Sequence, residues 1–158
     1  DEKHLLFTGS DYTLLEIYTK VWVEGGEAPK EEVVLWEGEA IADDWGNQPN
    51  LLSDGGVELQ AAGAQVGQEI RFYITPTDSF WQLEIVEGHW SGVTYAKYSS
   101  PGADDGGKFT EWDLDANGGY VPLTITQEML DAAYVQQWWG GTFIGNGDNV
   151  NITKITLY

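Results

Sequence analysis

The chain contains no cysteine among its 158 residues. Disulfide bonds, thiolate catalysis and zinc sites built from cysteine are therefore excluded. Histidine is nearly as scarce, since only His4 and His89 are present, and one central histidine cannot form a metal site without partners. The sequence also lacks a serine-hydrolase elbow and a paired-histidine zinc motif. These absences remove most of the common catalytic centres.

Basic residues are few. Seven lysines and arginines stand against 26 aspartates and glutamates, and the formal net charge is -19. Arg71 is the only arginine, so no basic patch is available to neutralise phosphates. We therefore predict no nucleic-acid partner, and an anionic membrane surface would repel the chain as well. A neutral ligand, a cation or a basic protein remains compatible with this charge.

Long apolar runs are absent too, so the sequence predicts no membrane span. The chain begins at Asp1-Glu2-Lys3 without a leader peptide, which favours a mature or excised fragment. Hydrophobic residues make up 42% of the chain, enough for one globular domain with a core. We expect a protein that is secreted or displayed on the cell surface.

Aromatic residues and glycine are abundant. The chain has 8 Trp, 8 Tyr and 5 Phe, with 20 Gly. Eight indoles exceed what one small core needs, so we expect some of them on the surface for contact with a ligand. For each tryptophan taken singly, core packing is the competing interpretation.

Residues 80–90 show the clearest period-two pattern, which is typical of a half-buried strand. Trp81, Leu83 and Ile85 are predicted to face the core. Gln82 and Glu84 would face the other side, together with Trp90 if no bulge intervenes at Gly88. Such a face suits a hydroxyl-rich ligand, although an ordinary solvated strand with an incidental tryptophan has the same pattern.

The preceding segment, residues 68–75, alternates in the same way and predicts a second strand. Its apolar positions are Ile70, Phe72 and Ile74, while Arg71 and Tyr73 face the other side. The turn over residues 76–79 is short, so we expect a hairpin. This hairpin would bring the polar faces together on one surface, formed by Arg71, Tyr73, Gln82 and Glu84.

The remaining elements are mostly short strands separated by glycine-rich turns. Thr126 is the expected N-cap of the one well-marked helix, over residues 126–134, and a shorter helix is compatible with residues 57–65. The pattern predicts an all-β fold, a jelly-roll-like β-sandwich with one short helix. Further strands are expected at residues 33–39, 95–98, 109–114 and 121–125 (an edge strand, since it contains Pro122), with a closing hairpin over 142–158.

Two regions suggest the domain organisation. Residues 5–23 repeat the pattern of residues 142–158, including the same break in alternation. Residues 1–32 are therefore interpreted as an N-terminal hairpin and linker, the tail of an upstream copy of the module, and residues 33–158 as the sandwich itself. The alternative is that two edge strands look alike by chance.

Clustered acidic residues are candidates for catalysis and for calcium binding. Glu84 with Glu87, and Asp43 with Asp44, could serve as glycosidase carboxylates, but chance pairs are certain in so acidic a chain. Residues 113–118 begin like an EF-hand loop, yet its twelfth position is Thr124 instead of glutamate, which favours a simple turn. We predict no catalytic residue and no cofactor, and leave a structural calcium ion in the acidic loops open.

Sugar binding needs flat apolar surfaces for the CH-rich faces of pyranose rings, and amides or carboxylates for their hydroxyls. Three groups in the sequence combine an indole with amides or carboxylates: one around Trp45, one around Trp90 and one around the pair Trp138-Trp139. In the adjacent pair Trp138-Trp139 one ring is expected to face the core, and Trp139 is the one predicted to face outward. The predicted ligand-binding residues are Trp45, Asn47, Tyr73, Gln82, Glu84, Trp90, Gln137 and Trp139.

The chain resembles the non-catalytic carbohydrate-binding modules of Bacteroidetes-type xylanases, glucanases and surface glycan-binding proteins. The resemblance covers residues 33–158 and lies in Leu35-Trp36-Glu37-Gly38, Asp44-Trp45-Gly46-Asn47, Gly67-Gln68-Glu69-Ile70-Arg71-Phe72 and Asn149-Val150-Asn151-Ile152-Thr153-Lys154-Ile155. It implies a β-sandwich that binds plant polysaccharide, a β-1,4-linked xylan or β-glucan or xyloglucan, beside an attached catalytic domain or tandem module. The alternatives are a small glycosidase or lyase and a protein-docking sandwich.

Overall fold

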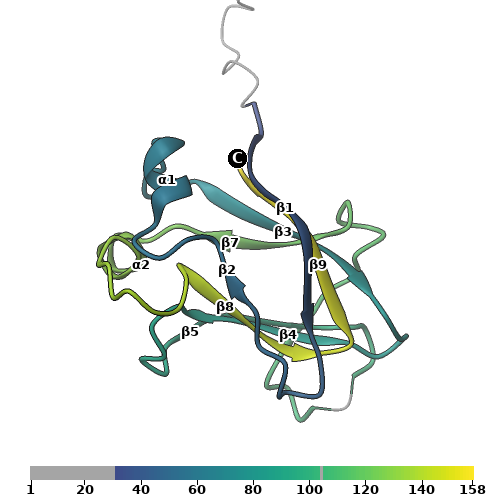
Figure 1. Ribbon diagram of the computed structural model, residues 1–158. Coiled ribbons are helices and arrows are strands. Elements are labelled where there is room, and N and C mark those ends of the chain that lie inside the picture. The colour runs from purple at the N-terminus through teal and green to yellow at the C-terminus, as the bar shows by residue number, and fades with distance from the viewer. Residues whose placement is uncertain (1–30, 104) are drawn as a thin grey trace, which may run out of the picture. The chain divides into compact units, whose positions relative to one another are not determined.

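A computed structural model describes residues 31–103 and 105–158. The predicted hairpin and upstream module copy over residues 1–23 lie outside the described residues, and the boundary at residue 33 stays a prediction. Two sheets form the described part (Figure 1). One has the order β1-β9-β3-β7, with β1 Val33–Ala42, β9 Val150–Leu157, β3 Glu69–Pro76 and β7 Tyr120–Thr124. The other has the order β2-β8-β4-β5-β6, with β2 Asn50–Leu51, β8 Phe143–Asp148, β4 Gln82–Glu87, β5 Thr94–Ser99 and β6 Thr110–Glu111.

The core lies between the two sheets, and the alternation in the sequence predicted which side chains fill it. Trp81, Leu83 and Ile85 are buried, as are the apolar residues of β3, Ile70, Phe72 and Ile74. Phe72 from the four-stranded sheet meets Phe143 from the five-stranded sheet edge to face, with ring centroids 5.8 Å apart. The predicted all-β sandwich with a short helix is thus confirmed.

The predicted hairpin between β3 and β4 is wrong. β3 pairs with β7 and β9, whereas β4 pairs with β5 and β8 in the other sheet. Both strands carry an apolar face, and the two faces bury each other across the core instead of lying side by side. Arg71 and Tyr73 therefore lie on the outer face of one sheet, and Gln82 and Glu84 on the outer face of the other.

The closing hairpin over residues 142–158 is wrong for the same reason. β8 and β9 belong to different sheets. The chain changes sheet at Asn149, whose φ is 58° and whose side-chain amide donates to the Phe80 carbonyl oxygen at 3.1 Å. The Thr77 N–H donates to the Asn149 carbonyl oxygen at 3.0 Å, so the two crossings between the sheets brace each other.

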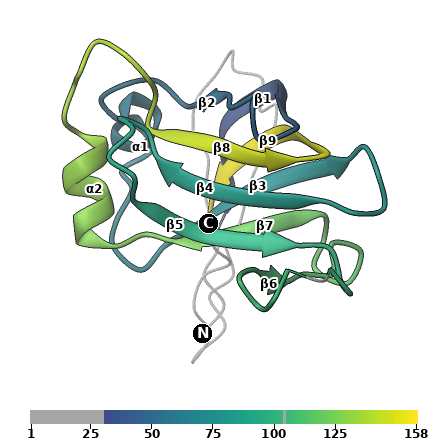
Figure 2. The ribbon, with the colours of Figure 1, turned by 90° about the horizontal axis from the view of Figure 1, so that it is seen from below.

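Two helices accompany the sheets, α1 Val57–Ala61 and α2 Gln127–Ala133. The predicted cap of α2 is confirmed, since the Thr126 hydroxyl accepts from the Met129 N–H at 3.2 Å. Figure 2 shows α2 at the end of the sandwich where β4 ends and β5 and β8 begin. Neither helix of the described residues has the length and apolar character needed to cross a bilayer.

Strand ends differ in detail from the predictions. β7 is an edge strand and accommodates Pro122, as expected. β6 has only two residues and pairs in parallel with β5. β4 ends at Glu87, and the next residue lies close to the segment before β8: the Gly88 N–H donates to the Thr142 carbonyl oxygen, and a Cβ at Gly88 would overlap the Gly141 carbonyl oxygen.

This ending changes the position of Trp90. Its φ is 59°, outside the extended region, and it follows a turn instead of continuing β4. The prediction that Trp90 shares one strand face with Gln82 and Glu84 is therefore wrong. Its side chain belongs to the loop between β4 and β5.

Replacing Gly88 with alanine tests the close approach of β4 and β8. Because backbone atoms of Gly141 occupy the Cβ position, we expect Gly88→Ala to lower the free energy of unfolding by about 1–3 kcal/mol. Urea denaturation measures the change. Gly46→Ala is the control, since its Cβ would meet nothing closer than 3.6 Å, and it should stay within about 0.5 kcal/mol of wild type. Equal losses in the two variants would contradict this close approach.

Candidate functional site

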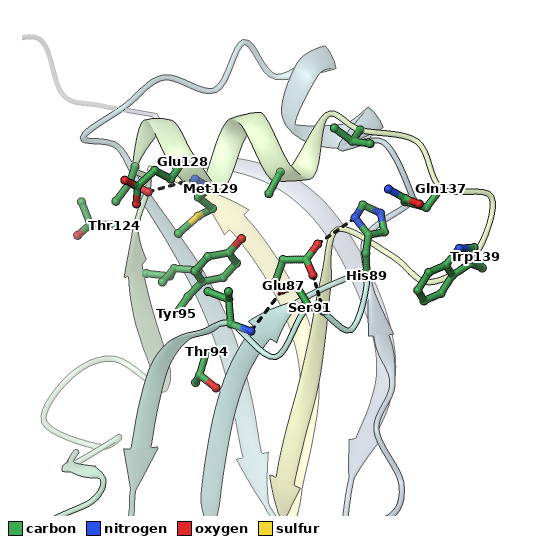
Figure 3. A pocket seen from close by; sticks show the side chains of 15 residues that line it. Glu87, His89, Ser91, Thr94, Tyr95, Thr124, Glu128, Met129, Gln137 and Trp139 are labelled. Atoms are coloured by element: carbon green, nitrogen blue, oxygen red, sulfur yellow. Dashed lines mark hydrogen bonds and ion pairs between the residues drawn. The ribbon is translucent and has the colours of Figure 1, made fainter.

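A pocket of about 740 Å³ opens at the α2 end of the sandwich. Its walls come from the end of β4, the β4–β5 loop, β5, β7, α2 and the α2–β8 loop (Figure 3). Hydroxyl and amide groups line it together with apolar side chains, which include Met129 and Val135. Elements far apart in the sequence thus build one concave site.

Tyr95 and Glu87 form the inner part of the pocket. The Tyr95 ring packs edge to face on Phe143 of the core, with centroids 6.1 Å apart. Burial, and secondarily the charge of Glu87, raises the pKa of Tyr95 to about 12. The phenol therefore stays a neutral hydrogen-bonding group. Glu87 is only 5% exposed, an unusual position for a carboxylate.

A histidine between two carboxylates connects the pocket to the neighbouring loops. His89 Nδ1 lies 2.9 Å from Glu87 Oε1, and His89 Nε2 lies 2.8 Å from Asp54 Oδ1. The second Glu87 oxygen accepts from the Ser91 N–H at 3.1 Å. Figure 3 shows these contacts of Glu87, with His89 between that carboxylate and Gln137.

Asp54 also holds the loop between α2 and β8. Its Oδ2 accepts from the backbone N–H of Gln137 at 2.9 Å and from that of Trp138 at 2.6 Å. The hydrogen bond from His89, and then those from Trp138 and Gln137, hold the pKa of Asp54 below its usual range. One carboxylate therefore ties the β2–α1 turn to both the β4–β5 loop and the α2–β8 loop.

Three exposed tryptophans come from these loops. Trp138 is 86% exposed, and Trp90 and Trp139 are each 52% exposed. The Trp139 ring stands edge to face to His89, with centroids 6.2 Å apart, and forms part of the pocket rim (Figure 3). The prediction that one ring of the pair faces the core is wrong, because residues 138 and 139 lie in a loop without strand alternation.

The backbone at several exposed tryptophans is strained. Trp45, Trp90 and Trp138 have φ values of 52°, 59° and 65°. Bulky residues rarely adopt this left-handed conformation, and each instance costs on the order of 1–3 kcal/mol. Such strain clusters at ligand-binding and catalytic sites, and here it marks three of the four exposed indoles in the described residues.

The structure thus gathers part of the predicted set at the pocket. Gln137 and Trp139 line it, and Trp90 lies between its lining residues His89 and Ser91. Glu87 and Trp138 were assigned no ligand-binding role from the sequence. Their position depends on which loops meet at this end of the sandwich, and neither alternation nor spacing reports that.

Four predicted residues, Trp45, Asn47, Gln82 and Glu84, belong to the five-stranded sheet or the loop before it. Glu84 pairs with Lys97 Nζ at 2.7 Å and accepts from the Asn146 amide at 3.2 Å. The 38% exposed Trp45 meets Phe109 edge to face, at 5.9 Å.

Two members of this set have little freedom to contact a ligand. Gln82 is only 8% exposed. The Asn47 side-chain amide donates to the Ile41 carbonyl oxygen at 2.7 Å, which stabilises its own loop.

Tyr73 lies apart from both groups, on the four-stranded sheet. Its hydroxyl donates to Glu32 Oε1 at 2.8 Å, and Lys154 Nζ lies 3.9 Å from the centre of its ring. Burial, and then the hydrogen bond to Glu32, raises its pKa. The expectation that Tyr73 joins Gln82 and Glu84 on one surface is therefore wrong.

Metal binding finds no ready site in residues 31–103 and 105–158. No group of three or more histidine and acidic side chains there has an arrangement that could hold a metal ion. Residues 114–119 form a turn, in which Asp113 Oδ1 accepts from the Ala116 N–H at 3.1 Å.

Comparisons with known proteins show a similarity of fold. No family model and no curated protein matches the chain. Among solved structures, it is similar to SGBP-B of the mixed-linkage glucan utilization locus of Bacteroides ovatus, in complex with a mixed-linkage heptasaccharide. The TM-score is 0.52 at 19% identity, over 80% of this chain and 28% of that one. The chain thus spans less than a third of that protein and shares its fold there.

Oxidation by N-bromosuccinimide tests the exposure of the indoles. Because Trp138 is 86% exposed and Trp81 is 4% exposed, substoichiometric reagent should modify Trp138 first, then Trp90 and Trp139, and should spare Trp81. Peptide mass spectrometry measures the order. Modification of Trp81 as early as Trp138 would show that the loop geometry is incorrect.

Proposed function

We propose that this chain is a non-catalytic carbohydrate-binding module for neutral plant cell-wall polysaccharide with β-1,4 linkages, a xylan, a β-glucan or xyloglucan. The observation that carries the proposal is the group of exposed indoles, Trp90, Trp138 and Trp139, beside a pocket that combines apolar side chains with hydroxyl and amide groups. Indole faces stack on the CH-rich faces of pyranose rings, and Gln137 and the pocket hydroxyls are suited to sugar hydroxyls.

The charge of the site favours a neutral glycan. Glu87 and Glu128 line the pocket, and its described lining contains no lysine or arginine. The whole chain carries a formal net charge of -19. A polysaccharide rich in uronic acid would be repelled both at a distance and on contact.

The ligand of the similar solved structure supports the proposal. SGBP-B was determined with a mixed-linkage heptasaccharide, a neutral β-glucan fragment. We extend this class of ligand to the present chain, and with it an extracellular or cell-surface location. The proposed partners are the polysaccharide and an attached catalytic domain or tandem module, which a binding module keeps at high local concentration on an insoluble substrate.

The contacts of Glu87 favour binding over catalysis. A glycosidase needs two accessible carboxyl groups that flank the scissile bond. Both oxygens of Glu87 are already engaged, one by His89 and the other by the Ser91 N–H. With 5% exposure, Glu87 is a structural group in this arrangement.

Affinity electrophoresis against soluble mixed-linkage glucan, xyloglucan and xylan tests the proposal. Retardation by at least one of them is expected. Trp139→Ala should weaken binding roughly tenfold or more, since a lost stacking platform is worth about 1.4 kcal/mol or more. Phe80→Ala is the matched control, because Phe80 is a 40% exposed aromatic residue at the opposite end of β4.

Three outcomes would redirect the proposal. Loss of binding in Trp45→Ala alone would move the site to the five-stranded sheet. Release of reducing ends from the glycans over hours would favour the alternative of a small glycosidase or lyase. Retardation by none of the glycans would favour a protein-docking sandwich.

A further inference from the structure

We propose that His89, held as an imidazolium between Asp54 and Glu87, is the positioning residue that fixes the two tryptophan-bearing loops at the pocket. The inference rests on the proposed function only for its effect on glycan binding. The geometry of the loops carries the rest.

The protonation of His89 follows from its two contacts. Both ring nitrogens lie within 2.9 Å of a carboxylate oxygen. His89 Nδ1 faces Glu87, and His89 Nε2 faces Asp54. An ionised carboxylate only accepts hydrogen bonds, and a neutral imidazole carries one N–H. Two hydrogen bonds of this kind require a proton on each nitrogen, which gives the ring a positive charge.

The charged and titratable groups around the ring agree with this state. Asp54 from the turn before α1 and Glu87 from β4 contact the ring, and Tyr95 from β5 and Glu128 from α2 line the same pocket. All four are acids, and no lysine or arginine lines the described pocket. The imidazolium is therefore the one cation among the pocket residues that the structure describes.

This cluster connects separate loops through a short chain of contacts. Ser91 N–H binds Glu87, Glu87 binds His89, His89 binds Asp54, and Asp54 binds the N–H groups of Gln137 and Trp138. Trp90 lies in the β4–β5 loop, and Trp138 and Trp139 lie in the α2–β8 loop. Fixing both loops before a ligand arrives reduces the entropy lost on binding.

The ability of the cluster to hold the loops should be greatest at an intermediate pH and should fall on both the acid and the alkaline side. The pKa of Asp54 is lowered in the folded state, so its contribution is present above the usual aspartate pKa and is lost as pH falls through the lowered value. On the alkaline side, loss of one His89 proton leaves a nitrogen lone pair facing a carboxylate oxygen. That link then becomes repulsive, and one loop is released.

Asp54→Asn gives the sharpest test, because in this variant the loop should be held more firmly, instead of less firmly, as the pH rises. The asparagine oxygen can still accept from Gln137 and Trp138, while its NH₂ donates to a neutral His89 Nε2. In wild type, hydrogen-exchange protection at Trp138 N–H should fall roughly tenfold from about pH 5 to about pH 9. In the variant it should rise over the same interval, and glycan affinity should follow protection in both proteins. Glu58→Gln is the matched acid-to-amide control, since Glu58 binds Ser53 in the adjacent turn, and it should keep the wild-type profile.

A second measurement uses wild-type protein without glycan, and so remains decisive if the asparagine variant fails to fold. Two-bond ¹H–¹⁵N spectra should show both ring nitrogens of His89 protonated at neutral pH, assigned by the loss of those signals in His89→Gln. One unprotonated nitrogen, or equal pH profiles for wild type and Asp54→Asn, would overturn the inference. If these spectra agree and no glycan binds, the positioning role stands and the proposed function fails.

Discussion

The edge-to-face contact between Phe72 and Phe143 is the interaction on which the rest of the structure depends, because it joins the two sheets at the centre of the core. Phe143 also meets Tyr95, whose hydroxyl end belongs to the pocket. Core packing therefore continues without interruption into the wall of the candidate site. Strands β4, β5 and β7 and helix α2 supply walls of the pocket and the neighbouring loops complete it, an arrangement suited to holding a ligand in a defined orientation.

Local features of the fold could be predicted from the sequence because they depend on local physics. Alternation identified the buried residues of β3 and β4, and a hydroxyl before an apolar helix identified the Thr126 cap. Sheet membership could not be predicted in this way. A short turn serves equally well between paired strands and between strands that face each other across a core, so β3 with β4, and β8 with β9, were assigned to hairpins.

The same limit explains the candidate site. Composition correctly indicated surplus indoles on the surface, yet the grouping of residues followed the mistaken hairpin, which placed Tyr73 with Gln82 and Glu84. The loops that carry Trp90 and Trp139 meet because Gly88 packs on Gly141 and because Asp54 binds both His89 and the Trp138 N–H. Both causes are contacts over long sequence separations, and neither leaves a period or a motif in the chain.

The left-handed backbone at Trp90 and Trp138 has a consequence for the composition of this fold. Glycine or asparagine would occupy either position with less strain, so a chain optimised for folding alone would carry those residues there. A bulky ring at such a position keeps the backbone beside the pocket strained. Relieving the strain at these two positions would therefore stabilise the sandwich but remove two of its exposed aromatic rings.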